Sequence, residues 1–120
     1  MWRSQVFQTE TEGSTLIVTT LENVSNLMGN EIGVEIDRLL QQFRQGGLTN
    51  VVVDLGKAEY FGSYMLEVMN RLWRQVRGKR GRMSVCNASD FGKEVLHVTR
   101  LDTLWPVCDA RDEAIRVVSQ

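Results

Sequence analysis

The spacing of apolar and polar residues divides the chain into alternating strand and helix patterns. Two apolar stretches open it, Val6-Phe7 and the β-rich run Thr15–Leu21, and Thr11–Ser14 between them has the composition of a turn. From Asn30 the apolar residues recur every three or four positions until Gly46-Gly47, which predicts a first helix. Its buried face would contain Ile32, Ile36, Leu39, Leu40 and Phe43.

Strand and helix patterns continue to alternate beyond residue 50. Val51–Leu55 is an apolar run broken only by Asp54, as is typical of a central strand covered on both faces. Two further strands are predicted, at Met83–Cys86 and at Leu104–Cys108, the second as an edge strand that tolerates Pro106. The order of elements favours an α/β fold with an N-terminal hairpin, about five strands in one mixed, mostly parallel sheet, and about four helices.

Three helices are predicted in this second part of the chain. The first would end at Gly78, and its apolar face comprises Met65, Leu66, Met69, Leu72, Trp73 and Val76. Ser89 and Asp109 are placed to cap the other two helices. Because no linker, repeat or low-complexity segment interrupts the pattern, residues 1–120 are predicted to form a single domain.

Composition narrows the class of protein. Fourteen basic and fifteen acidic residues leave a net charge of -1, which argues against a nucleic-acid binder held by overall charge. No run of about 18 apolar residues could span a bilayer, and residues 1–8 lack the apolar core of a signal peptide, so a cytoplasmic location is predicted. Cys86 and Cys108 lie in apolar segments and are predicted to be free, buried thiols.

Ser63 is the most informative single residue, because it lies where a predicted strand has ended and a helix begins. The unpaired N–H groups and the positive dipole end of a helix N-terminus favour an anion, so a phosphate on this hydroxyl would be tolerated. The simpler interpretation is that Ser63 is an ordinary N-cap, worth about 1 kcal/mol. From the residues alone both interpretations stay open.

An ordered set of segments resembles the STAS domain, the fold of bacterial anti-sigma factor antagonists and of the cytoplasmic tail of sulfate transporters. The resemblance covers about residues 5–118. It is carried by Val51–Leu55, Tyr60–Leu66, Gly81–Asn87, Leu101–Asp109 and Glu113–Ile115. It implies a STAS fold and a protein that acts by binding, with an anti-sigma factor or a serine kinase as partner.

The resemblance also places Ser63 at the position of the phosphorylated Ser or Thr of these antagonists. The family pattern has Asp before that residue and a small residue and Gly after it, whereas this chain has Gly62, Tyr64 and Met65. The chain thus lacks a carboxylate beside the hydroxyl and adds bulk where a partner would approach. Together with Asp54, residues 62–65 are the predicted partner interface, and Ser63 is the predicted phosphorylation site.

Other chemistry-bearing residues are interpreted as structural or solvated. Asp54 has no second carboxylate at useful spacing except Glu59, so a structural or interface role is favoured over catalysis. His97 is predicted on the surface of a helix. A solvated face is indicated by the basic run Arg71, Arg74, Arg77, Lys79, Arg80 and Arg82. The functional alternatives are an acidic partner surface and, disfavoured by the near-neutral total charge, nucleic acid. No glycine pattern resembles a phosphate-binding loop, and no cofactor, metal or nucleic acid is predicted.

Three hypotheses for function follow. The leading one is a non-enzymatic antagonist of an anti-sigma factor that regulates transcription by partner switching, with phosphorylation of Ser63 as the switch. The second is a STAS scaffold that has lost this switch and self-associates, for instance as a homodimer. The third is an enzyme or ligand-binding protein that uses the strand ends near Asp54.

Overall fold

The computed structural model describes residues 6–21 and 30–120. Residues 1–5 and 22–29 lie outside the described residues, as does the side chain of Ile32, which was predicted on the buried face of the first helix. The described chain forms, in order, β1 (Phe7–Glu12), β2 (Thr15–Thr20), α1 (Asn30–Gln45), β3 (Asn50–Asp54), α2 (Ser63–Gly78), β4 (Met83–Cys86), α3 (Asp90–Val98), a 3-10 helix (Leu101–Thr103), β5 (Val107–Cys108) and α4 (Arg111–Ser119).

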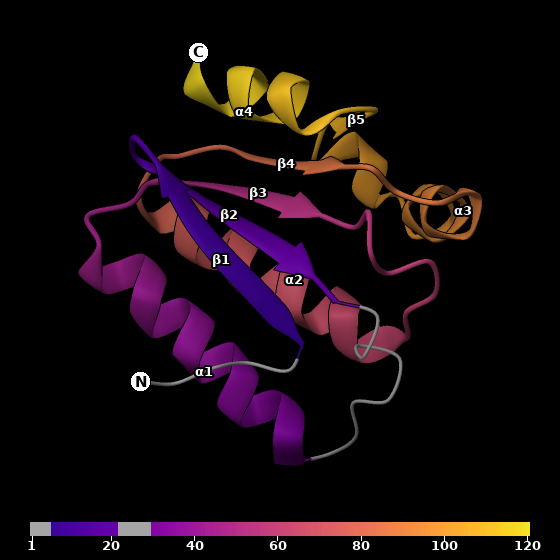
Figure 1. Cartoon of the computed structure of the whole chain (residues 1–120), viewed down its shortest axis with the longest axis horizontal. Coiled ribbons are helices and arrows are strands. Elements are labelled where there is room, and N and C mark those ends of the chain that lie inside the picture. The colour runs from indigo at the N-terminus through magenta and orange to yellow at the C-terminus, as the bar shows by residue number, and fades with distance from the viewer. Residues whose placement is uncertain (1–5, 22–29) are drawn as a thin grey trace.

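The five strands form one sheet in the order β1-β2-β3-β4-β5 (Figure 1). β1 pairs antiparallel with β2, and every later pair is parallel. The predicted α/β fold is therefore confirmed, including the N-terminal hairpin and the mixed, mostly parallel sheet. Because β2, β3, β4 and β5 are parallel, their carboxyl ends lie together along one side of the sheet.

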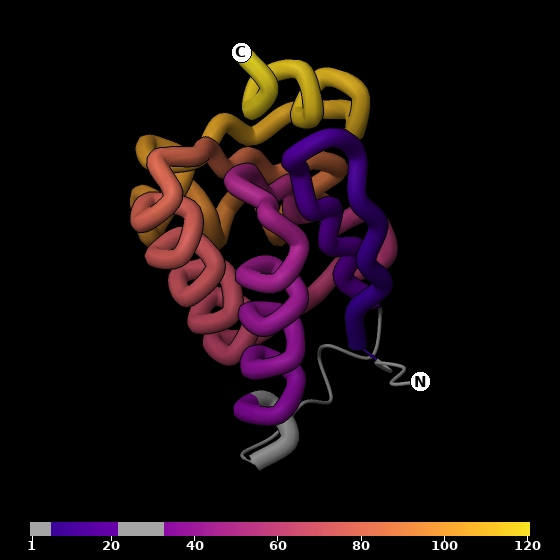
Figure 2. Tube along the Cα trace, turned by 90° about the vertical axis from the view of Figure 1, so that its left-hand side faces the viewer, coloured from indigo at the N-terminus to yellow at the C-terminus, as the bar shows by residue number. Residues whose placement is uncertain are grey.

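Helices cover both faces of the sheet. α1 and α2 lie on one side and α4 on the other, while α3 lies beyond the end of β4 (Figures 1 and 2). Successive residues of β3 point to opposite faces: Val51 and Val53 belong to the core beneath α1 and α2, and Val52 belongs to the core beneath α4. All three valines are fully buried, as predicted for a central strand covered on both sides.

The N-terminal turn is shorter than the sequence indicates. It was predicted over Thr11–Ser14, but β1 continues through Glu12 and only Gly13-Ser14 forms the turn. Gly13 adopts a φ of 59°, a left-handed conformation that is easy only for glycine. The glycine therefore fixes where the chain reverses, and the polar residues before it continue the strand.

The C-terminal part of the chain departs from the prediction in two places. The last strand covers Val107–Cys108 rather than Leu104–Cys108, because Trp105 is 1% exposed and packs edge-on against Trp73 with ring centroids 6.4 Å apart. Asp109 does not cap the last helix. α4 starts after Ala110 with no side-chain cap, and the Asp109 carboxylate lies 3.7 Å from Lys93 Nζ instead.

Gly81 occupies a position where no side chain fits. A Cβ atom there would lie 1.7 Å from the Thr49 carbonyl oxygen, so Gly81→Ala must displace backbone, and we expect it to lower the free energy of unfolding by about 3 kcal/mol. Urea denaturation measures this loss. Gly78→Ala is the matched control because a Cβ at Gly78 meets nothing within 4 Å, and equal stability of the two variants would contradict the prediction.

Candidate functional site

The predicted phosphorylation site lies at the first residue of α2. Gly62 occupies the N-cap position and offers no side-chain cap, so the interpretation of Ser63 as the N-cap is wrong. Ser63 is exposed, and its hydroxyl makes no hydrogen bond with any described residue. The first turn of α2 contains no acidic residue, which leaves the positive end of the helix dipole uncompensated. The hydroxyl is therefore accessible and has no structural task.

The residues that flank Ser63 differ in their exposure. Tyr64 is 39% exposed and presents part of its ring to solvent, whereas Met65 is fully buried. The Met65 sulfur accepts a hydrogen bond from the Thr20 hydroxyl at 3.8 Å. Met65 therefore does not form part of the predicted interface surface; it anchors the first turn of α2 to the sheet.

Asp54 is likewise inside the protein, at 6% exposure. Its Oδ1 accepts hydrogen bonds from the backbone N–H of Gly56 at 2.9 Å and from the Asn87 side chain at 3.2 Å. Its Oδ2 accepts one from Arg111 Nε at 3.0 Å. Since both oxygens bond within the protein, Asp54 holds the end of β3 in place, and this favours its structural interpretation over the catalytic one.

Arg111, at the start of α4, binds side chains of three strands through its guanidinium. Besides Asp54, the guanidinium donates to Glu10 Oε2 at 2.6 Å and to the Thr19 hydroxyl at 2.8 Å. The hydrogen bond with Glu10 is the main reason that the pKa of Arg111 lies above its usual value. The arginine thus joins β1, β2 and β3 to α4 at the end of β3, where the loop that leads to Ser63 begins.

An exposed aromatic pair links this loop to α3. Tyr60 is 59% exposed and Phe91 38% exposed, and their rings meet edge-on with centroids 5.2 Å apart. Phe91 also packs edge-on against Phe61, which is 6% exposed. Tyr60 and Phe91 therefore form a supported apolar surface near the start of α2, which we call the aromatic pair.

Ser89 fastens the loop to α3. Its hydroxyl accepts the N–H of Gly92 at 3.1 Å, so the predicted cap is confirmed, and it donates to the Glu59 carbonyl at 2.7 Å. A Cβ on Gly92 would lie 3.3 Å from the Phe61 ring, which shows how closely the helix approaches the loop. The loop before Ser63 is thus held by α3 on one side and by Asp54 on the other.

A shallow groove runs along the solvent face of α2 from Ser63. It has a volume of about 350 Å³ and is lined by Ser63, Leu66, Glu67, Asn70, Arg71 and Arg74. Inside this groove, Arg71 Nε lies 3.7 Å from Oε1 of Glu67, which is one helical turn earlier. We refer to this feature as the α2 groove.

Most of the chain, including these features, matches a known protein family. Residues 7–114 match the pattern that defines the STAS domain. The chain belongs to the STAS family. Among the described residues, no helix is long and apolar enough to cross a membrane.

Relatives of this STAS domain are anti-sigma factor antagonists. BtrV of Bordetella bronchiseptica, named as a candidate anti-sigma factor antagonist, is 25% identical over 99 residues, which cover 82% of this chain and 83% of BtrV. The structure of an anti-sigma-factor antagonist (STAS) domain protein from Planctomyces limnophilus aligns with a TM-score of 0.80 at 25% identity, over 95% of this chain and 98% of that one. SpoIIAA in its unphosphorylated form shares the fold, with a TM-score of 0.79 at 17% identity and coverage of 95% and 96%.

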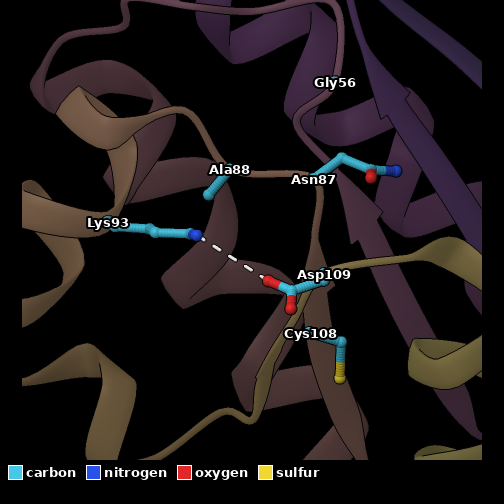
Figure 3. Close-up of a pocket in the computed structure, with 6 residues that line it drawn as sticks. All are labelled: Gly56, Asn87, Ala88, Lys93, Cys108 and Asp109. Atoms are coloured by element: carbon cyan, nitrogen blue, oxygen red, sulfur yellow. Dashed lines mark ion pairs between the residues drawn. The ribbon is translucent and has the colours of Figure 1, made fainter.

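A second hollow of the STAS domain lies at the strand ends, where an enzyme of this architecture would hold its substrate. It has a volume of about 490 Å³, and Figure 3 shows Lys93 reaching across it toward Asp109. These two charges neutralise each other, and burial raises the pKa of the Cys108 thiol, which keeps it protonated and a poor nucleophile. Within residues 6–21 and 30–120, no group of three His, Cys, Asp or Glu side chains could hold a metal ion.

Both cysteines of the STAS domain are free and buried, as predicted. Burial, followed by the negative charge of Asp54, raises the pKa of Cys86 from its usual 9.0 to about 12. The unfolded chain releases this proton near pH 9 while the folded protein keeps it. We therefore expect the free energy of unfolding to fall with rising pH between pH 9 and about 12, by up to roughly 1.4 kcal/mol per pH unit.

Urea denaturation of the wild type and of Cys86→Ala at pH 8, 9, 10 and 11 measures this effect. The stability difference between the two proteins should shrink or reverse above pH 9, because only the wild type carries the buried thiol. Tyrosine and lysine titrations occur in both proteins and cancel in the difference. A difference that stays constant over this range would contradict the prediction.

Sequence reasoning placed the loop and Ser63 but missed the residues that support them. The sequence does not indicate the role of Arg111, because this residue lies 57 positions from Asp54 and only the folding of the sheet brings the two side chains together. Phe91 lies in α3, for which the sequence predicted only the cap at Ser89, and its aromatic side chain was the signal available. His97 lies on the surface as predicted, 77% exposed, with Nδ1 3.0 Å from Asp102 Oδ2.

Proposed function

We propose that this protein is a cytoplasmic anti-sigma factor antagonist that acts by binding and is released from its partner when Ser63 is phosphorylated. The observation that carries the proposal is the exposed Ser63 hydroxyl, which has no hydrogen-bond partner among the described residues and lies at the uncompensated N-terminus of α2. The family and its antagonist relatives support a protein partner. SpoIIAA, which shares this fold, exists in an unphosphorylated and a phosphorylated form.

The surface available to the partner consists of Gly62, Ser63 and Tyr64 with the aromatic pair beside them. Asp54 and Met65, although part of the interface predicted from the sequence, support this surface from below. Tyrosine and phenylalanine that are exposed on a rigid base are the residue types that anchor protein interfaces. We infer that the anti-sigma factor covers the aromatic pair and the first turn of α2.

The experiment that tests this proposal is phosphorylation by the serine-kinase anti-sigma factors of the source organism, each purified and incubated with the protein and ATP. Mass spectrometry should locate the phosphate on Ser63. Ser63→Ala should remain unmodified, Ser63→Thr should still accept phosphate, and Ser14→Ala, which removes another exposed serine, should be modified as in the wild type. If none of these kinases binds the protein and none modifies it, the proposal is refuted.

A second candidate function is a constitutive STAS scaffold without the phosphoswitch. Gly62 favours it, because this residue brings no carboxylate to help position the Ser63 hydroxyl. This candidate requires that Ser63→Glu bind every partner as the wild type does. Sedimentation velocity of the purified chain would detect self-association, and a homodimer unaffected by Ser63→Glu would support it.

A further inference from the structure

The charges of the molecule are strongly segregated. Residues 63–82, which comprise α2 and the turn after it, carry six basic side chains and one acidic one, whereas the rest of the chain carries eight basic and fourteen acidic ones. The near-zero net charge of the whole chain therefore conceals one cationic region. Because the exposed residues of α2 supply three of the six cations, this positive charge faces solvent on the side of the sheet opposite α4 (Figures 1 and 2).

The two ends of the α2 groove differ in charge. Ser63 and the half-buried Leu66 lie at one end, and Arg74 lies at the other, roughly 16 Å away along the helix axis. Glu67 neutralises part of the charge of Arg71 through their 3.7 Å pair. Arg74 is exposed, and its side chain has no ion pair or hydrogen bond within the described part of the chain, so its charge is uncompensated.

Neighbouring cations add to this charge without being neutralised. Arg44 of α1 donates to the Gln75 side chain at 3.2 Å, and Arg77 lies over the Trp73 ring with its guanidinium 6.0 Å from the ring centroid. Both partners are uncharged. The arginines at this end of α2 are therefore held in place while they keep their positive charge, an arrangement that attracts anionic surfaces from a distance.

We propose that the α2 groove binds a carboxylate-bearing surface of the partner protein, with the acidic side chains of the partner directed at Arg71 and Arg74. This inference rests on the proposed function and deepens it. A phosphate on Ser63 would enter the same groove and repel the carboxylates that the arginines attract. The basic run that the sequence indicated thus becomes the electrostatic half of the interface, and the aromatic pair its apolar half.

A protein fits the groove better than a nucleic acid does. Glu67 lies in the middle of the groove, where it would repel a continuous phosphodiester backbone but can be accommodated between separate carboxylates. None of the described residues that line the groove is aromatic, so bases would find no ring to stack on there, and Leu66 offers an apolar contact instead. The fourteen acidic residues elsewhere add to the repulsion of a polyanion that extends beyond the groove.

Charge reversal in the groove, measured against the anti-sigma factors used above, tests the inference. Arg74→Glu should weaken binding about tenfold at 50 mM salt, mainly through a slower association rate, and should reduce the dependence of affinity on salt. Arg71→Glu should act in the same direction. Arg116→Glu makes the same charge change at an exposed position of α4, on the other side of the sheet. Its affinity should stay within about twofold of that of the wild type. Circular dichroism checks that each variant is folded.

The outcomes separate this inference from the proposed function. If the wild type binds an anti-sigma factor and Arg71→Glu and Arg74→Glu bind it equally well, the groove is not the docking site for acidic side chains, while the proposed function stands. No binding of any of these anti-sigma factors to the wild type would overturn both. Binding of the wild type to a 20-base-pair DNA duplex or to phosphatidylglycerol vesicles at physiological salt, lost in Arg74→Glu, would overturn a protein as the occupant.

Discussion

An Arg111→Met variant is expected to lose about 3 kcal/mol of unfolding free energy. Removing the guanidinium leaves the carboxylate of Asp54, which is 6% exposed, without its cationic partner, and loss of one partner of a buried pair costs about 3–5 kcal/mol. The lower end of that range applies because the Arg111 side chain is 32% exposed and water screens part of the interaction. Methionine retains most of the apolar stem, so the change tests the charge.

Urea denaturation at pH 7 measures this loss, and α4 provides the control. Arg116→Met alters an exposed arginine five residues later in the same helix and should change stability by no more than about 0.5 kcal/mol. Adding Asp54→Asn to Arg111→Met should recover part of the loss, because no uncompensated charge then remains inside. If Arg111→Met were as stable as Arg116→Met, the network at the end of β3 would not hold α4 to the sheet.

The elements with strong local patterns were predictable from the sequence. The four helices and the central strand follow from the spacing of apolar residues, which the cores on both faces of the sheet reproduce. The cap at Ser89 was predictable because a serine hydroxyl before a helix has a local partner, the N–H of Gly92. Because the loop before Ser63 follows β3 directly, the order of these elements also places it at the carboxyl ends of the parallel strands.

The network around Arg111 was not predictable, because the partners of this α4 residue come from three other elements, β1, β2 and β3. Glu10 lies 101 residues away in the sequence, and only the pairing of β1 with β2 and of β2 with β3 brings it to the guanidinium. No periodic pattern records such a contact. The short last strand escaped prediction for a similar reason, since the burial of Trp105 depends on Trp73 in a different helix.

Met65 shows how two predictions from one sequence conflicted. The helical spacing placed it on the buried face of α2, while its position two residues after Ser63 placed it in the partner interface. The structure follows the helical spacing, since Met65 is fully buried. In a helix that covers a sheet, the direction of each side chain is set by its angular position around the axis, and nearness in sequence to an exposed residue does not change that direction.

Phosphorylation of Ser63 is expected to weaken binding of the anti-sigma factor by at least about 100-fold. The phosphate adds about -1.5 to -2 charges at neutral pH to a hydroxyl that lies in the α2 groove beside Tyr64. If the partner must desolvate this dianion or leave it unpaired, the cost is a few kcal/mol, and each 1.4 kcal/mol lowers affinity about tenfold. The protein itself should remain folded, because the charge lies at the positive end of α2.

Isothermal titration calorimetry of the unmodified, phosphorylated, Ser63→Ala and Ser63→Glu proteins against the same anti-sigma factor measures this effect. Ser63→Ala is the matched control and should bind within about twofold of the wild type, because the hydroxyl has no hydrogen bond among the described residues to lose. Thermal unfolding of the phosphorylated protein separates release from unfolding. Unchanged affinity of both charged forms would favour the constitutive scaffold, since an interface that tolerates a dianion at the start of α2 must lie elsewhere on the molecule.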